Sequence, residues 1–236
     1  MEQMIERAKA QGWYHTLELP GYTTSGVFDL RPVVGEYGLP DSLAGKRVLE
    51  VGTWDGFWAF EMERRGADEV IAIDLDDENE LDWPPRRRTP KDEVVRGSGF
   101  ALAKELLDSK VERVVRSVYD ATAEDLGTFD LVFCGSVLIH LRDQLLAMER
   151  IASLTKPGGV FISAEAYERV TDLAPFPMAR FRGNRDKAVV FWVPNRKGWR
   201  DMLWFAGFDR VEEHSRFTMK STEGYSVRHV VNHAHR

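Results

Sequence analysis

Short apolar runs alternate with helix-like segments along the chain, and this alternation constrains the fold more than any other feature. The runs that predict strands span 46–52, 69–74, 111–120, 129–135, 160–165, 210–217 and 225–233. The segments with helical spacing span 57–67, 99–108, 144–154 and 196–208. Asp143 and Asn195 precede the last two segments, where we expect them to be N-caps. Strands separated by helices pair in parallel through crossover connections, so we expect an α/β fold: a doubly wound, mostly parallel sheet of seven strands with helices on both faces.

Length and charge narrow the classes of protein that remain. A chain of 236 residues, 43% of them hydrophobic, can bury one substantial core and is most simply a single domain. The formal net charge of -6 argues against a surface built for nucleic acid. A basic run at 84–91 leaves local contact with RNA phosphates open, although such runs are more often solvated loops. The sequence does not decide the oligomeric state.

Cysteine content and hydropathy bear on the compartment. Cys134 is the single cysteine, which excludes a disulfide within the chain and suits a reducing environment. The first 13 residues form a charged amphipathic pattern rather than a signal peptide, and no apolar stretch of about 18 residues occurs. We therefore expect a cytoplasmic protein with no membrane association.

Three acidic residues stand where the first three predicted strands end. The first strand carries Glu50 and runs into the pattern E-x-G-x-x-x-G, the second ends at Asp74 and the third at Asp120. Ligands of such sheets bind outside the carboxyl ends of the strands. The glycine spacing differs from the G-x-G-x-x-G of dinucleotide sites, and Glu50 would repel a pyrophosphate, which disfavours a nicotinamide oxidoreductase. S-adenosylmethionine carries a sulfonium and an amino group, so an acidic rim attracts it.

Residues 45–165 resemble class I S-adenosylmethionine-dependent methyltransferases. The resemblance rests on the E-x-G-x-x-x-G loop, Asp74, "YDA" at 119–121, "FDLVFCGSVLIHL" at 129–141 and "LTKPGG" at 154–159. That family usually has a third glycine where this chain has Trp54, a replacement compatible with cofactor binding if Trp54 takes a negative φ. The motif "GTWDG", with "WYHTLELP" upstream and "FWVPN" downstream, is similar to the transfer RNA wobble-uridine methyltransferases and their small-molecule relatives.

The resemblance implies a role for each residue around the cofactor. The residues it assigns to S-adenosylmethionine are Glu50, Gly52, Thr53, Trp54, Gly56, Asp74, Leu75, Asp120, Ala121, Gly135 and Ser136. Glu50 would orient the amino group, Asp74 would accept both ribose hydroxyls, and Asp120 would accept the adenine amino group. Gly135 and Ser136 would lie near the methionine chain. Taken singly, a strand-end aspartate is more often a turn former or helix cap.

The acceptor side is defined less sharply. His140 follows the fourth strand and would serve as general base for an oxygen acceptor; the alternative is a helix cap or pocket wall. The residues expected to bind the acceptor are Trp13, Tyr14, His15, Glu165, Tyr167, Arg180 and Arg182. The first three would form a lid, or alternatively pack as a staple on the first helix. The arginines suit an acceptor that bears a carboxylate or phosphate, or are ordinary loop arginines.

These expectations combine into one functional hypothesis. The chain would be one methyltransferase domain: 1–44 N-terminal helix and lid, 45–165 cofactor-binding core, 166–195 acceptor-side insertion, 196–236 last helix and final strands. It would move a methyl group to a small acceptor, at oxygen, by in-line displacement. The alternatives are a wobble-uridine methyl- or carboxymethyltransferase and a catalytically silent partner subunit. By resemblance, the RNA enzymes carry an aromatic residue where this chain has Ile139, which favours the unmodified cofactor.

No metal is required by this chemistry. His229, His233 and His235 would share one face of the last strand, but no Cys or carboxylate stands at ligand spacing. We therefore interpret them as histidines on the edge of the C-terminal strand. Trp58, in the first turn of the helix after the loop, is expected to back the pocket rather than to bind a ligand.

Overall fold

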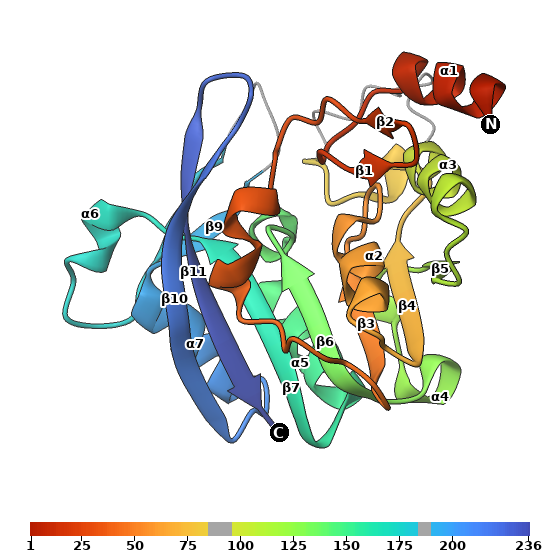
Figure 1. Cartoon of the computed structure of the whole chain (residues 1–236). Helices are drawn as coiled ribbons and strands as arrows, with labels where there is room; N and C mark the ends of the chain where they lie inside the picture. Colours follow the sequence, from red (N-terminus) through yellow and green to blue (C-terminus); the bar gives the residue numbers. More distant parts are fainter. Residues whose placement is uncertain (85–95, 184–189) are drawn as a thin grey trace.

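A seven-stranded sheet forms the centre of the computed structural model, which describes residues 1–84, 96–183 and 190–236 (Figure 1). Its strand order is β10-β11-β7-β6-β3-β4-β5. The strands are β3 (Arg47–Val51), β4 (Glu69–Asp74), β5 (Glu112–Val115), β6 (Phe129–Gly135), β7 (Thr155–Ala166), β10 (Arg210–Lys220) and β11 (Ser226–His235). Strands β5, β4, β3, β6 and β7 are parallel, and β11 and β10 join antiparallel. The predicted α/β fold is confirmed.

The direction of chain growth reverses beside β3. From β3 the chain adds β4 and β5 on one side, then crosses over to add β6 and β7 on the other. The crevice between the carboxyl ends of β3 and β6 is therefore the topological switch point, where sheets of this class bind ligands.

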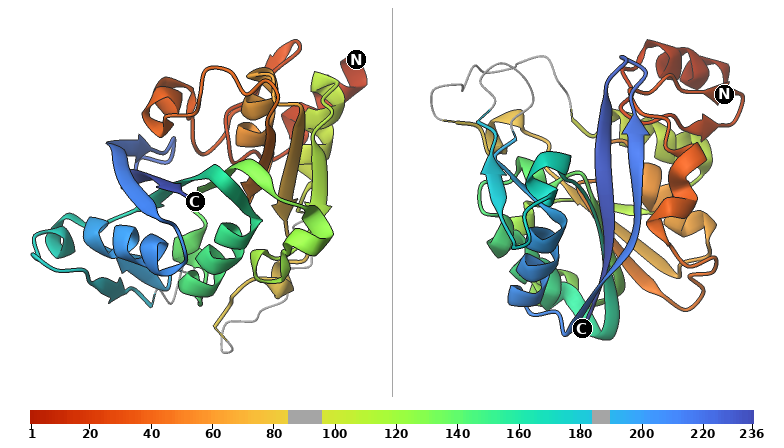
Figure 2. Two further views of the ribbon diagram at one scale, coloured as in Figure 1. Left: turned by 90° about the horizontal axis from the view of Figure 1, so that it is seen from below. Right: turned by 90° about the vertical axis from the view of Figure 1, so that its left-hand side faces the viewer.

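Helices cover both faces of the sheet (Figure 2). The helices are α1 (Glu2–Ala10), α2 (Phe57–Arg64), α3 (Ser98–Leu107), α4 (Ala123–Leu126), α5 (Gln144–Leu154), α6 (Arg169–Asp172) and α7 (Arg196–Phe205). One hydrophobic cluster joins α2 and α3 to the sheet, and a second joins α5 and α7 to the opposite face. Strands β3, β4 and β6 are therefore buried on both faces, which explains their nearly unbroken apolar sequences, whereas the edge strand β5 is partly exposed.

Both predicted helix caps are confirmed. The Asp143 side chain accepts from the N–H of Leu146 at 3.0 Å, and Asn195 accepts from Gly198 at 2.8 Å. The boundaries of the third and fifth strands differ from the prediction. The third strand, expected to end at Asp120, ends at Val115 as β5, and Asp120 lies in a 3-10 helix. Strand β7 already begins at Thr155 and includes the "KPGG" segment. Thr155 pairs with Phe129 of β6 ahead of an irregularity in the ladder, so this segment lies in the sheet although its glycines suggested a stop.

Segments outside the main sheet carry short elements that the sequence pattern did not predict. The pairs β1 (Glu18–Leu19) with β2 (Tyr22–Thr23), and β8 (Ala179–Phe181) with β9 (Trp192–Pro194), form two small antiparallel sheets. Four short 3-10 helices complete the described elements: η1 (Arg31–Tyr37), η2 (Glu78–Glu80), η4 (Val118–Asp120) and η5 (Leu138–His140). The basic run at 84–91 lies, apart from its first residue, outside the described residues.

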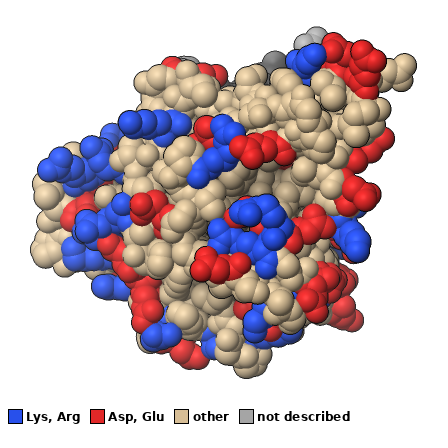
Figure 3. Space-filling model, in the orientation of Figure 1, with Lys and Arg blue, Asp and Glu red and all other residues tan. Residues whose placement is uncertain are grey.

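The surface charge is mixed. In Figure 3, Lys and Arg side chains gather on the left of the molecule over the region of α6, whereas acidic side chains predominate along the right-hand edge. This face is therefore not uniformly basic, in line with the net charge of -6. Among the described helices, none combines the length and the apolar character needed to cross a membrane.

Candidate functional site

The loop after β3 takes the backbone conformation that its glycines predicted. Gly52 has φ 79° and Gly56 has φ 92°, values that a residue with a Cβ adopts at a cost. A Cβ on Gly52 would overlap the Val137 side chain, and one on Gly56 would overlap the ring of Phe60. Both positions therefore require glycine, because side chains of the protein itself lie where a Cβ would stand.

Trp54 contradicts the expectation of a negative φ. It has φ 50°, in the left-handed region. The tryptophan that replaces the third glycine of the usual loop therefore does not adopt a right-handed conformation. Three contacts hold it there. Its N–H donates to Asp74 Oδ2 at 2.7 Å, the Arg96 guanidinium lies 4.4 Å from its ring centroid, and the Tyr14 ring lies 5.0 Å away. The side chain stays 39% exposed, so Trp54 covers the loop instead of packing beneath it.

Glu50 lies beneath the loop. It is 2% exposed, and Oε2 accepts from the Thr53 hydroxyl at 2.6 Å and from the N–H of Ala59 at 2.9 Å. Burial raises the pKa of the Glu50 carboxyl to about 8, against the opposing effect of these two hydrogen bonds. In the structure, Glu50 therefore connects β3, the loop and the first turn of α2.

Asp74 has both carboxylate oxygens engaged. Oδ2 accepts from Trp54, whereas Oδ1 accepts from the N–H of Leu75 at 2.7 Å and from the Arg96 guanidinium at 3.0 Å. Arg96 also donates to the Leu75 carbonyl at 2.9 Å and lies 3.4 Å from Glu78 Oε1. Its side chain is only 7% exposed. A buried guanidinium thus engages the carboxylate that the sequence predicted to accept the ribose hydroxyls.

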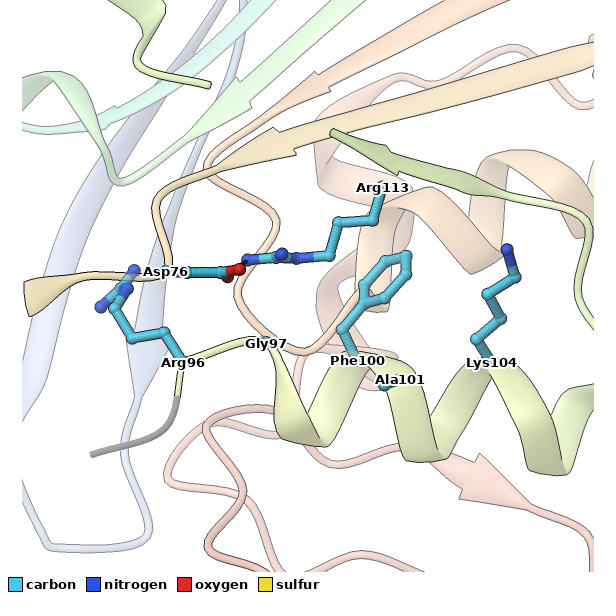
Figure 4. Close-up of a pocket in the computed structure, with 7 residues that line it drawn as sticks. All are labelled: Asp76, Arg96, Gly97, Phe100, Ala101, Lys104 and Arg113. Atoms are coloured by element: carbon cyan, nitrogen blue, oxygen red, sulfur yellow. Dashed lines mark ion pairs between the residues drawn. The ribbon is translucent and has the colours of Figure 1, made fainter. Parts of the chain in front are cut away.

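Two cavities adjoin Arg96, whose side chain lines both. The smaller measures about 80 Å³ and is lined by Gln11, Gly12, Trp54, Asp55, Asp74, Arg96, Gly97, Ser98 and Gly99. The larger measures about 340 Å³ and is lined by the seven residues of Figure 4, in which the Arg113 guanidinium points at the Asp76 carboxylate, 2.7 Å away. Pockets for small ligands measure about 300–1,000 Å³, so the smaller cavity beside Asp74 is too small for a cofactor. Arg96 and Gly97 line both cavities.

Asp55 connects the N-terminal segment to this loop. It is 2% exposed, and its Oδ2 accepts from the backbone N–H groups of Tyr14 at 2.9 Å and His15 at 2.8 Å. Its Oδ1 forms a short contact with Nδ1 of the same histidine. The segment expected to form a lid is therefore bound to the cofactor loop by a buried carboxylate. Trp13 is 5% exposed, and its indole N–H donates to Ala8 of α1 at 2.8 Å, so this residue packs on the first helix.

The carboxyl ends of β6 and β7 form the other wall. Glu165 is fully buried, and Oε1 accepts from the N–H groups of Val137 at 3.1 Å and Leu138 at 3.0 Å. Burial raises the pKa of this carboxyl to about 8, and among the described residues its buried Oε2 has no hydrogen-bond partner. Glu165 thereby holds the start of η5, which carries the partly exposed His140.

Ser136 lies between these elements. It has φ 58°, its N–H donates to Ala164 at 2.8 Å, and its hydroxyl lies 2.7 Å from Nε2 of His229. His229 is 1% exposed. The interpretation of His229, His233 and His235 as edge histidines is wrong, because β11 pairs with β7 on one side and with β10 on the other.

The remaining predicted residues lie around this rim. Asp120 is exposed in η4, and the N–H of Ala121 points at the Val118 carbonyl at 3.4 Å. Arg180 and Arg182 are exposed, and both pair with Glu168. The other members of the predicted set are Leu75 and Gly135, which are partly exposed at the ends of β4 and β6, and Tyr167, whose N–H donates to Arg228 at 3.1 Å.

The structure brings six of the predicted cofactor residues together in one hydrogen-bonded cluster at the carboxyl ends of β3 and β4. They are Glu50, Gly52, Thr53, Trp54, Gly56 and Asp74. Three further residues at this rim were not assigned a role from the sequence: Asp55, Arg96 and His229. Asp55 offered one signal, as an acidic residue inside the glycine loop. The described residues contain no group of three or more His, Cys, Asp or Glu side chains able to hold a metal ion.

A methyltransferase-domain family model matches residues 29–213. The chain belongs to this methyltransferase family. The match includes all five parallel strands and α7, and it confirms the predicted enzyme class and, with it, S-adenosylmethionine as the cofactor.

Curated relatives match about half of the chain. A ubiquinone biosynthesis O-methyltransferase from Xanthomonas campestris pv. campestris (strain B100) is 37% identical over 123 residues, which are 52% of this chain and 44% of that protein. The protein of the same name from Vibrio parahaemolyticus serotype O3:K6 is 34% identical over 124 residues, 52% of this chain and 45% of that one. The matched part is thus less than half the length of these relatives.

Solved structures share the fold at low identity. The N-terminal domain of EvdMO1, crystallised in the presence of SAH and D-fucose, has a TM-score of 0.68 and 18% identity, over 100% of this chain and 97% of that one. The 1,6-didemethyltoxoflavin-N1-methyltransferase of Burkholderia thailandensis has a TM-score of 0.55 and 15% identity, over 87% of this chain and 75% of that one. Proteins crystallised with different small molecules thus share this fold.

Proposed function

We propose that this protein transfers the methyl group of S-adenosylmethionine to an oxygen atom of a small acceptor by in-line displacement. The observation that carries the proposal is the family match over 29–213, which contains the carboxyl ends marked by Glu50, Asp74 and Asp120. The oxygen acceptor is supported by the O-methyltransferase names of the relatives that match half of the chain. The proposed division is a lid in 1–44, a cofactor core in 45–165, an acceptor-side insertion in 166–195, and the last helix and final strands in 196–236.

The strand order supports one orientation of the cofactor. Strands β6, β3, β4 and β5 are neighbours in that order. Asp74 follows β4 and takes the ribose hydroxyls, because a carboxylate offers two oxygens to a diol. Asp120 follows β5 and takes the adenine. The methionine end then extends across β3 towards β6, where Ser136 lies.

Binding in this orientation requires an exchange at Asp74. The ribose hydroxyls replace Arg96, whose ion pair with Asp74 is buried. Removing a buried pairing partner is costly unless the new partner makes equivalent hydrogen bonds, and two hydroxyl donors meet that need. The Arg96 side chain moves aside, which opens the space beside Asp74 that it now lines.

The acceptor lies beside η5, where His140 takes the proton of its hydroxyl. A methyl group on a sulfonium is already activated, so alignment and exclusion of water supply most of the rate, and the base supplies deprotonation. Glu165 holds the turn that carries this histidine. Tyr14 and His15, fixed by Asp55, close the opposite side as the lid.

The experiment combines calorimetry with methyl transfer from labelled S-adenosylmethionine. The wild type is expected to bind S-adenosylmethionine and S-adenosylhomocysteine, and to methylate members of a panel of phenols and catechols. Preference for the carboxylated cofactor and labelling of transfer RNA would establish the wobble-uridine alternative. Cofactor binding without transfer to any acceptor would favour a silent partner subunit, and binding of NAD alone would refute the cofactor.

The role of His140 is tested by substitution with Asn. The variant is expected to lose the limb of the rate-against-pH profile that reports a base near neutrality, while cofactor affinity stays unchanged. His214→Asn, on the exposed side of β10, is the matched control. A variant with the wild-type rate and profile would exclude His140 as the base.

A further inference from the structure

Ser136 and His229 form a hydrogen-bonded pair that joins strands far apart in the sequence. The Ser136 hydroxyl lies 2.7 Å from Nε2 of His229, and the two residues are 93 positions apart. His229 is opposite Ala166 in the antiparallel ladder, so the start of β11 meets the carboxyl end of β7. The pair therefore lies on the edge of the sheet where the cofactor binds.

The hydrogen bonds of His229 determine the direction of this contact. Nδ1 lies 3.2 Å from the Val227 carbonyl, which can only accept, so Nδ1 carries the proton. Burial lowers the pKa of the imidazole to about 4, so the ring is neutral and Nε2 has a lone pair. The Ser136 hydroxyl must donate to that lone pair. Its oxygen then has no proton to offer a ligand and only accepts.

Ser136 lies beside the switch point. It follows β6, and its neighbour Val137 packs against Gly52, which follows β3. Its backbone is left-handed, its N–H donates to Ala164 of β7, and its hydroxyl lies against His229, so the lone pair left on the hydroxyl oxygen is the side-chain acceptor that Ser136 can offer. A hydrogen-bond donor of the ligand is what such an oxygen selects.

We propose that His229 is a positioning residue that makes Ser136 a hydrogen-bond acceptor for the ammonium group of the methionine end of the cofactor. The inference rests on the orientation proposed above, in which that end extends towards β6. The only donor group on the methionine end of S-adenosylmethionine is its ammonium, so a site that only accepts distinguishes it from the neighbouring carboxylate. Glu50 lies beneath the loop, where its Oε2 already accepts two hydrogen bonds from the protein. An acceptor at Ser136 would therefore supplement Glu50 in binding the ammonium group.

Calorimetry with two ligands tests the role of Ser136. S-adenosylhomocysteine carries the ammonium, whereas 5′-methylthioadenosine lacks the amino-acid portion. We expect Ser136→Ala and His229→Phe each to weaken S-adenosylhomocysteine binding about tenfold, the typical effect of one hydrogen bond to a charged group. Affinity for 5′-methylthioadenosine should be unchanged. His233→Phe, on the same face of β11 with its Nε2 near the Tyr37 carbonyl, is the matched control.

The double variant separates action through Ser136 from a structural role. If His229 acts through Ser136, the double variant binds S-adenosylhomocysteine no more weakly than Ser136→Ala does. Additive losses, or equal losses for both ligands, would overturn the proposal. Lower affinity for the methyl acceptor with unchanged S-adenosylhomocysteine binding would also overturn it, because the donor would then belong to the acceptor.

A spectroscopic measurement does not depend on any variant. Nitrogen-15 spectra of the histidine rings are expected to show His229 as the neutral Nδ1–H tautomer with a hydrogen-bonded Nε2. The Nε2–H tautomer would overturn the inference even if the variants fail to fold. A wild type that binds no S-adenosylhomocysteine would overturn the cofactor orientation together with this inference, whereas binding that ignores both substitutions overturns this inference alone.

Discussion

Asp55→Ala should release the N-terminal lid segment from the cofactor loop. The substitution removes the acceptor of two backbone N–H groups, those of Tyr14 and His15, at a side chain that is 2% exposed. A buried donor left without a partner costs about 1–3 kcal/mol, so the two together cost about 3 kcal/mol with partial access of water. Each tenfold change in an equilibrium corresponds to about 1.4 kcal/mol, so local opening should become roughly 100-fold more frequent.

Asp55→Asn is the matched control because the geometry differs little. Both backbone N–H groups now donate to the same oxygen, Oδ2, and an amide oxygen in that position accepts both. The amide NH2 then faces Nδ1 of His15, which accepts in its Nε2–H tautomer. We expect this variant to keep most of the protection that Asp55→Ala loses.

Amide hydrogen exchange measures the effect directly. Exchange at Tyr14 and His15 should accelerate roughly 100-fold in Asp55→Ala, while amides of β3 keep their protection as an internal reference. S-adenosylhomocysteine binding should weaken in parallel if the N-terminal segment acts as the proposed lid. Unchanged exchange at the two amides would refute the reasoning, and equal acceleration in Asp55→Asn would show that charge rather than the acceptor geometry holds the segment.

Three further predictions follow from buried groups around the site. Trp58→Ala removes a ring 4.2 Å from that of Tyr37 and should lower the free energy of unfolding by about 3–5 kcal/mol with little effect on cofactor affinity; a collapse of affinity at constant Tm would contradict this. Arg96→Ala should bind S-adenosylhomocysteine more tightly than the wild type, because a cation that competes for Asp74 is removed. Asp74→Ala should bind it more weakly, because the proposed acceptor of the ribose hydroxyls is removed. The reverse order of affinities in calorimetry would show that Arg96 binds the cofactor. Burial raises the pKa of Glu165 from 4.5 to about 8, so the folded state holds a proton that the unfolded state releases. The free energy of unfolding of the wild type should therefore fall relative to that of Glu165→Gln as the pH rises from about 5 to about 8. An equal pH dependence of this free energy in the two proteins would refute the raised pKa of Glu165.

Local sequence determined the elements because their signals are local. The run "EVIAID" coincides with β4 and "FDLVFCG" with β6, because strands buried on both faces need unbroken apolar residues. Asp143 and Asn195 were recognisable as caps because the cap bonds to an N–H only three residues away. The glycine loop and the strand-end acids likewise depend on short spacings.

Contacts between distant segments were not predictable in this way. Arg96 reaches Asp74 across 22 residues, His15 reaches Asp55 across 40, and Ser136 meets His229 across 93. No spacing rule relates residues that meet only after β4, the N-terminal segment and β11 have been placed around β3 and β6. The sign of φ at Trp54 was missed for the same reason, since three partners from different segments hold a conformation that tryptophan rarely adopts alone.

The amino-acid sequence by itself determined the strands of the sheet, its helices and the acids Glu50 and Asp74 at the ends of β3 and β4, because hydrophobic periodicity and capping act within a few residues. Only the tertiary structure decided which of those groups are engaged: Glu50 beneath the loop, Asp74 paired with Arg96, and Ser136 directed by His229. The free energy that fixes these partners comes from burial and from the need to satisfy buried polar groups, and both arise only when the chain has closed around its two cores.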